Sequence, residues 1–159
     1  MTAWITEARK HLGLKEVIGK GTNLTIQSWL SNLRAWWRDD ETPWCGTFVA
    51  HCIKYSGYEL PKHWYRAMGW LDWGDDIGKT PCFGCVAILS RSGGGHVFFV
   101  LGYDNKGNLV GIGGNQGNAV SYQTFDINRV VGYRMPKNTF NRQALSIIDT
   151  MYKTSTNEA

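Results

Sequence analysis

The sequence predicts an α+β protein, because helical patterns fill the first half of the chain and strand patterns fill the second. In the first half, apolar residues recur at helical spacing, as at Ile26, Trp29, Leu30 and Leu33. In the second half, short apolar runs alternate with turn sequences such as 104–108, which reads DNKGN. We therefore expect N-terminal helices packed on a C-terminal antiparallel sheet of about five strands.

The expected elements follow in chain order. We predict helical segments at 4–12, 26–33, 43–57 and 65–73. We predict strands at 85–90, 96–103, 108–113, 118–125 and 130–135. A last helix, capped by Asn138 or Thr139, would carry Leu145, Ile148 and Met151. The chain then divides into a main domain, residues 1–137, and a C-terminal helix with a polar tail, residues 138–159.

The size and charge of the chain limit its class. With 159 residues, the chain can bury roughly 68–70% of its unfolded surface without disulfides or metals. Its 17 Lys and Arg against 13 Asp and Glu give a net charge of +4, which favours anionic partners such as wall polymers. No Lys/Arg run indicates a nucleic-acid-binding face, and no apolar stretch is long enough for membrane insertion.

Cys45 is the first candidate catalytic residue. Thr42 suits a helix N-cap and Pro43 the first helical position, so we expect the helix to begin at about Pro43. Cys45 would then lie in the first turn, where free N–H groups and the helix dipole lower a thiol pKa below about 8.5. The alternative is an inert core cysteine, because free cysteine is among the most buried residue types.

His96 is the second candidate. A glycine-rich loop precedes it and an apolar strand follows, so the sheet would hold its ring in place. A Cys on a helix start and a His on a distant strand form the pattern of a papain-like thiol hydrolase. The other histidines are weaker candidates; His51, for example, lies about 240° round the helix from Cys45. The remaining two are His11 and His63.

A third polar group should orient the histidine ring. Residues 109–120 predict a strand, a glycine-rich bend and a second strand, with Asn115 and Gln116 in the bend. An amide there could accept the ring N–H of His96 and fix its tautomer. We assign this role to Asn115, with Gln116 as the alternative, and expect Gln116 otherwise to contact substrate.

Four separated motifs carry a family resemblance. GLKEVIG at 13–19, DETPWC at 40–45, GGHV at 94–97 and GGNQ at 113–116 occur in the order found in phage-type CHAP endolysins, which are related to NlpC-type cell-wall peptidases. The chain resembles this family from about Trp4 to Pro136. The resemblance implies a papain-like fold, Cys45 as nucleophile, His96 as base and peptidoglycan amide bonds as substrate. Cys85 departs from the pattern, because such domains often carry Asp there.

The resemblance sets the expected function. It implies a peptidoglycan hydrolase, acting as an amidase or an endopeptidase. From the residues themselves we expect no cofactor and no metal, and we expect a monomer. Because Met1–Glu7 lacks the pattern of a secretory signal, we expect synthesis in the host bacterial cytoplasm and action in the periplasm or cell wall after release. The alternatives are an interbacterial amidase toxin, a non-catalytic wall-binding module and a C-x-x-C redox protein.

The tryptophans, the acidic run and the C-x-x-C pair allow both functional and structural interpretations. Of the eight Trp, we expect Trp44 to line the substrate cleft because it adjoins Cys45, and most of the others to pack. The acidic run 39–41 could suggest calcium, but three adjacent acids cannot all face one ion, so we expect a solvated acidic face. Cys82 and Cys85 have C-x-x-C spacing, and we interpret them as structural thiols because no further zinc-ligand pair accompanies them.

Overall fold

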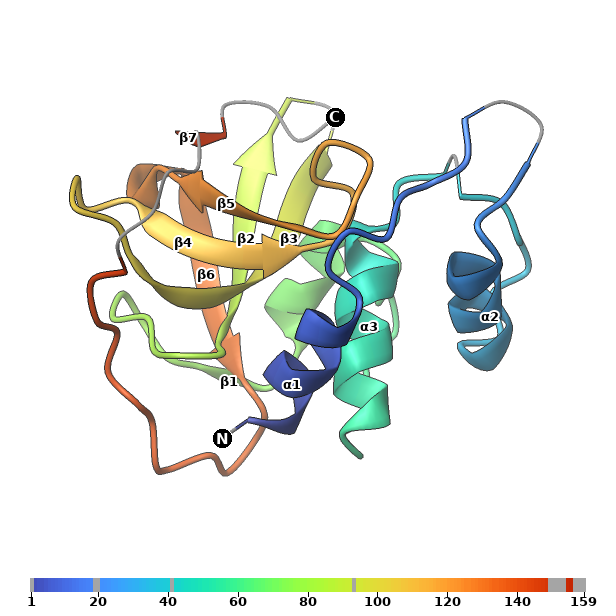
Figure 1. Cartoon of the computed structure of the whole chain (residues 1–159). Helices are drawn as coiled ribbons and strands as arrows, with labels where there is room; N and C mark the ends of the chain where they lie inside the picture. Colours follow the sequence, from blue (N-terminus) through green and yellow to red (C-terminus); the bar gives the residue numbers. More distant parts are fainter. Residues whose placement is uncertain (1, 19–20, 41, 93, 149–153, 156–159) are drawn as a thin grey trace.

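The second half of the chain forms a strongly curved sheet, and the first half supplies the helices beside it (Figure 1). The structure is a computed structural model, which describes residues 2–18, 21–40, 42–92, 94–148 and 154–155. Within these residues the α+β class predicted from the sequence is confirmed.

The sheet contains seven strands among the described residues. In spatial order they are β1 (Asp75–Asp76), β6 (Val130–Met135), β2 (Val86–Arg91), β3 (Gly94–Tyr103), β4 (Leu109–Gly113), β5 (Ser121–Phe125) and β7 (Thr154–Ser155). Neighbouring strands run antiparallel from β1 to β5, whereas β7 pairs with β5 in parallel. The five expected strands are present, and two short edge strands, β1 and β7, were not expected.

The helices pack mainly against one another and against the middle of the sheet. They are α1 (Ala3–Lys10), α2 (Leu24–Asn32), α3 (Cys45–Tyr55) and the 3-10 helices η1 (Ala67–Asp72) and η2 (Ile127–Arg129). Figure 1 shows α1 and α3 side by side, with α2 farther from the sheet. In the part of the chain that the structure describes, every helix lacks the length and apolar character needed to span a membrane.

Strand β3 is the central element of the core. On one face, the ring of Phe99 lies 6.4 Å from that of Phe48 on α3. On the other face, the ring of Phe98 stacks on Phe125 of β5 at 4.1 Å. Register shifts in the β2–β6 and β3–β4 pairs mark bulges, which increase the twist and help the sheet curl back on itself.

The N-terminal end of β3 extends beyond β4. The pairing of β3 with β4 ends at Phe99 opposite Ile112, whereas the pairing of β3 with β2 continues to Gly94. Residues 94–98 of β3 therefore have a sheet edge on the side of β4. The start of α3 and the loop after β4 both come to this edge, which positions the candidate site.

The predicted C-terminal helix is wrong over the described residues. Residues 140–148 run as an extended segment along the sheet, with Ala144 bridged to Cys82 and Ile147 bridged to Tyr103. The N–H of Ile148 donates to the carbonyl of Tyr103 at 2.6 Å. Leu145 packs on the core, so its apolar spacing reflects strand-like contacts and not a helix face. Met151 lies outside the described residues.

Candidate active site

Cys45 is the first residue of α3, two positions closer to the helix start than expected. Trp44 holds the N-cap position, and its carbonyl accepts the first helical hydrogen bond, from Phe48 N–H at 2.9 Å. Thr42 does not cap the helix, because its N–H and hydroxyl both donate to Asp39 Oδ1 at 2.8 Å. The prediction of a helix start at Pro43 was therefore wrong in detail, but Cys45 does lie at the N-terminal end.

The environment of the Cys45 thiol differs from the expectation in one respect. Burial raises the pKa of the thiol, and hydrogen bonds from the N–H groups of Val97 and Gly46 and the charge of Arg91 oppose this rise only in part. The side chain is 6% exposed. The lowered pKa predicted for Cys45 is therefore wrong, because desolvation by burial outweighs the backbone hydrogen bonds and the charge of Arg91.

His96 lies on the same stretch of β3, one residue before the N–H that contacts the thiol. Its ring is buried and stacked near Phe98 and Phe125, with ring centroids 5.8 and 5.7 Å away. Its Nε2 lies 2.9 Å from Oε1 of Gln116. The two aromatic neighbours and the contact with Gln116 help to fix the orientation of the imidazole.

The bonds of Gln116 determine the tautomer of His96. The amide Nε2 of Gln116 donates to the carbonyl oxygen of Ser121 at 2.7 Å, and that oxygen can only accept. The amide oxygen therefore faces the ring, so the His96 Nε2 carries a hydrogen that it donates to Gln116. In the neutral ring, Nδ1 then carries the lone pair and is the nitrogen able to accept a proton.

The loop after β4 joins the histidine side of the site to the cysteine side. A Cβ at Gly113 would collide with Oε1 of Gln116, which contacts His96. A Cβ at the next residue, Gly114, would lie 2.7 Å from Cβ of Phe48 and 2.8 Å from Cζ3 of Trp44, which flank Cys45. The residues around His96 and the residues around Cys45 therefore contact two adjacent glycines, Gly113 and Gly114. Glycines are required here because both sides approach the backbone.

Gln116, and not Asn115, contacts the ring of His96. Asn115 has a left-handed φ of 57°, a conformation that Asn tolerates better than most residues. The chain reverses just after it, with the N–H of Gln116 donating to Ala119 O at 2.9 Å. Asn115 therefore shapes the turn that directs Gln116 to the histidine. The sequence alone gave no means of distinguishing two adjacent amides in a glycine-rich bend.

Trp44 does not face a cleft in this structure. It is 1% exposed, lies among core residues and donates its indole N–H to Glu16 Oε1 at 3.2 Å. The expected role of Trp44 in substrate contact therefore lacks an accessible surface. Gln116, the other residue expected to contact substrate, is 2% exposed, and its Oε1 contacts the ring of His96.

An aromatic group near the start of α3 offers the accessible rings instead. Trp36 is 90% exposed, and its ring packs edge-on against Trp37 at 5.3 Å. Trp37 in turn stacks on Trp64 at 5.9 Å with an interplanar angle of 23°. A Cβ at Gly46 would lie within 3.1 Å of backbone atoms of Trp64 and Tyr65, so this group adjoins the residue after Cys45.

Arg91, at the end of β2, is a site residue that sequence reasoning missed. Its positive charge lowers the pKa of the Cys45 thiol, which places it within electrostatic reach of the sulfur. Its Nη1 is buried and has no hydrogen-bond partner among the described residues. Nothing in the sequence around Arg91 marks this role, because it depends on how β2 is aligned with β3 (Arg91 lies opposite Gly94).

The acidic run and the C-x-x-C pair have structural contacts. Asp40 is fully buried, and its Oδ2 accepts from the N–H groups of Val17 and Asn23 at 2.7 and 2.8 Å. It therefore organises a loop and is not part of a solvated face; Glu41 lies outside the described residues.

The two thiols of the C-x-x-C pair contact each other. The hydrogen bond with Cys85 lowers the pKa of Cys82, whereas burial raises the pKa of Cys85.

Comparison of the chain with protein-family models, curated proteins and solved structures gives no match.

Proposed function

We propose that the chain is a thiol hydrolase that cleaves amide bonds of bacterial peptidoglycan. The observation that carries this proposal is the arrangement of Cys45, His96 and Gln116 around the N-terminal end of β3. Cys45 comes from a helix start, His96 from a strand and Gln116 from a loop. A thiol, an imidazole and an amide drawn from such elements are the functional groups of papain-like hydrolases.

The chemistry assigns one role to each group. Sγ of Cys45 attacks the amide carbonyl carbon while Nδ1 of His96 takes the thiol proton. The C–N bond then breaks, and the imidazolium returns that proton to the leaving amine, which leaves a thioester on Cys45. Water hydrolyses the thioester with His96 again as base, and the thiol is restored. Gln116 accepts the ring Nε2–H throughout and keeps Nδ1 available.

The start of α3 can supply the oxyanion site. The first N–H groups of a helix have no intrahelical acceptor, and those of Cys45 and Gly46 point toward the thiol. Donors held in this way stabilise the negative oxygen of a tetrahedral intermediate, and losing one costs about 2.7–4 kcal/mol in a well-studied protease. Arg91 adds a positive charge on the same side of the site.

Support for peptidoglycan as substrate comes from the family resemblance and from the surface near Cys45. The exposed indole of Trp36 and the stacked pair Trp37 and Trp64 present flat apolar faces suited to sugar rings and peptide planes. The net charge of +4 favours an anionic wall polymer. A papain-like fold and a phage endolysin role remain part of this proposal and depend on the motif resemblance.

Digestion of purified bacterial walls tests the proposal. The wild-type chain should release soluble fragments with new amino groups, and mass spectrometry of these fragments should identify the bond that is cut. Cys45→Ala should abolish release while far-UV circular dichroism stays unchanged. Cys82→Ser is the matched control, because it removes a different buried thiol and should retain cleavage. Binding to walls without release of amino groups would instead indicate a wall-binding module.

A further inference from the structure

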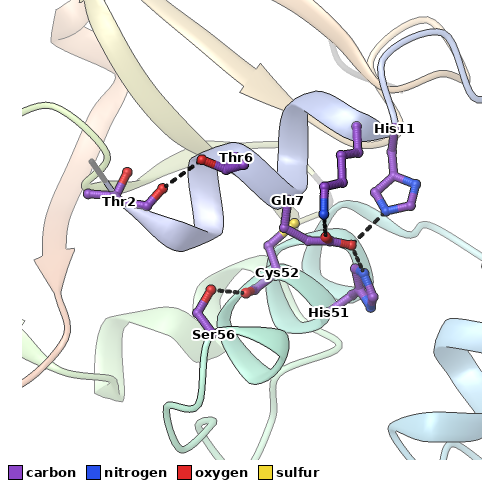
Figure 2. Close-up of polar contacts among 8 residues, drawn as sticks. Thr2, Thr6, Glu7, His11, His51, Cys52 and Ser56 are labelled. Carbon is purple, nitrogen blue, oxygen red and sulfur yellow. Dashed lines mark hydrogen bonds and ion pairs between the residues drawn. The ribbon is translucent and has the colours of Figure 1, made fainter.

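A buried carboxylate joins two histidines at the contact between α1 and α3, away from the thiol site. Glu7 of α1 is 5% exposed, and its Oε2 lies 2.9 Å from Nε2 of His11 and 2.8 Å from Nε2 of His51 (Figure 2). Glu7 and His11 are four residues apart on α1 and so share one helix face, whereas His51 comes from α3. All three ligand atoms lie within 4.8 Å of one another.

These separations suit a small divalent ion. In a tetrahedral zinc site with bonds of about 2.0–2.1 Å, neighbouring ligand atoms are about 3.3 Å apart. The two measured contacts need to open by only about half an ångström to reach that value. Two imidazoles, one carboxylate and a water molecule are a known zinc ligand set.

The surroundings already hold the ligands in position. Trp29 stacks on the ring of His51 at 4.9 Å and meets the ring of His11 edge-on at 5.0 Å. Lys10 Nζ lies 3.4 Å from Oε1 of Glu7, which leaves Oε2 for the shared contact. Ligands whose orientation is fixed by their neighbours lose little entropy when a metal binds.

The cluster is accessible to an ion from solvent. The side chains of His11 and His51 are 19% and 15% exposed. A pocket of about 370 Å³ opens beside His51, and its lining residues are Asn32, Leu33, His51, Lys54 and Tyr55. This opening provides a route for the ion and space for a water ligand.

We propose that Glu7, His11 and His51 form a zinc site that clamps α1 to α3, with water as the fourth ligand. Oε2 of Glu7 already contacts Nε2 of both rings, so the three ligand atoms converge on one point. Without metal, both rings donate Nε2–H to this carboxylate; with metal, each ring carries its hydrogen on Nδ1.

This site is independent of the thiol chemistry. His51 is six residues after Cys45, which is about 9 Å along the helix axis and about 240° round it. No metal was expected from the sequence, because the chain contains no second C-x-x-C and no paired His motif. Glu7 and His11 alone have suitable spacing, but the third ligand comes from a separate helix.

Metal titration of the full chain tests the proposal, using zinc and cobalt(II) as probes. The background is a Cys82→Ser, Cys85→Ser double variant, because a C-x-x-C pair can itself bind zinc. We expect one equivalent of metal, visible cobalt bands typical of tetrahedral nitrogen and oxygen ligation, and no thiolate charge-transfer absorption. A hundredfold excess of zinc over its dissociation constant should raise the Tm by about 5–10 °C.

Matched variants assign the ligands. His11→Gln and Glu7→Gln should weaken zinc binding more than tenfold, whereas Lys10→Ala should leave it within threefold because Lys10 contacts only Oε1. His11→Gln is the variant that best preserves folding, because its ring is partly exposed. The proposal fails if the double variant binds no metal, if cobalt shows thiolate ligation, or if His11→Gln and Lys10→Ala bind zinc equally well. None of these readouts depends on hydrolase activity.

Discussion

Replacement of Gln116 by Ala tests the assignment of the residue that orients His96. The change removes the acceptor of the His96 ring N–H at 2.9 Å and the donor to Ser121 O at 2.7 Å. Leaving a buried polar group without its partner costs about 1–3 kcal/mol. If losing this acceptor raises the free energy of the transition state by the same amount, kcat should fall about 5- to 150-fold with KM little changed.

The stability of this variant should remain sufficient for the assay. Only the bond to His96 is fully buried, and its loss lowers the free energy of unfolding by about 1–3 kcal/mol, against a total of about 5–15 kcal/mol for ordinary domains. Folding should be checked by circular dichroism before kinetics on a soluble muropeptide. The rate of Cys45 alkylation across pH gives a second measurement that needs no substrate.

Two further variants make the result specific. Asn115→Gly keeps the left-handed turn, because glycine adopts a φ of 57° without strain, and should retain activity within about twofold. Gln116→Glu still accepts the ring N–H, so activity should be partial. Its charge favours the imidazolium form, so the acid limb of the pH profile should move to higher pH. A folded Asn115→Gly variant that loses more activity than Gln116→Ala would refute the assignment of Gln116.

Three other changes have outcomes that follow from the structure. Arg91→Gln should slow alkylation of Cys45 at any fixed pH, because the charge that lowers the thiol pKa is removed; an unchanged pH profile would exclude this role. Trp36→Ala should raise KM several-fold with kcat retained, and an unchanged KM would exclude substrate contact at this ring. Burial raises the pKa of Cys45 and Cys52 above 9.0, so the unfolded chain ionises first and the free energy of unfolding should fall as pH rises past about 9. Chemical denaturation at several pH values measures this fall, which should be smaller in Cys52→Ala.

The secondary structure was largely predictable because its signals are local. The apolar runs at 96–103 and 130–135 and the turn at 104–108 define strands without reference to the rest of the chain. The predicted helix 65–73 occurs as the shorter 3-10 helix η1. The helix predicted over the segment carrying Leu145 was wrong. The apolar spacing of this segment fits a helix and an extended strand equally well, and only its pairing with Cys82 and Tyr103 selects the extended form.

The candidate site was predictable in its residue types but not in its contacts. Cys45 was identified because Pro43 and an apolar stripe locate a helix start. The choice between Asn115 and Gln116 depends on a turn whose backbone angles are set by tertiary contacts. Trp44 was expected in a cleft because it adjoins Cys45, but adjacent residues at a helix start point in different directions, and Trp44 points into the core.

The raised pKa of Cys45 favours one form of thiol catalysis for the proposed function. A preformed thiolate requires a thiol pKa near or below the working pH, and burial opposes that here. In the proposed mechanism, His96 therefore removes the thiol proton as the carbon–sulfur bond forms. The rate of the proposed reaction would then depend strongly on the orientation of the His96 ring, which the contact with Gln116 maintains. It also predicts slow alkylation of Cys45 at neutral pH in the free protein.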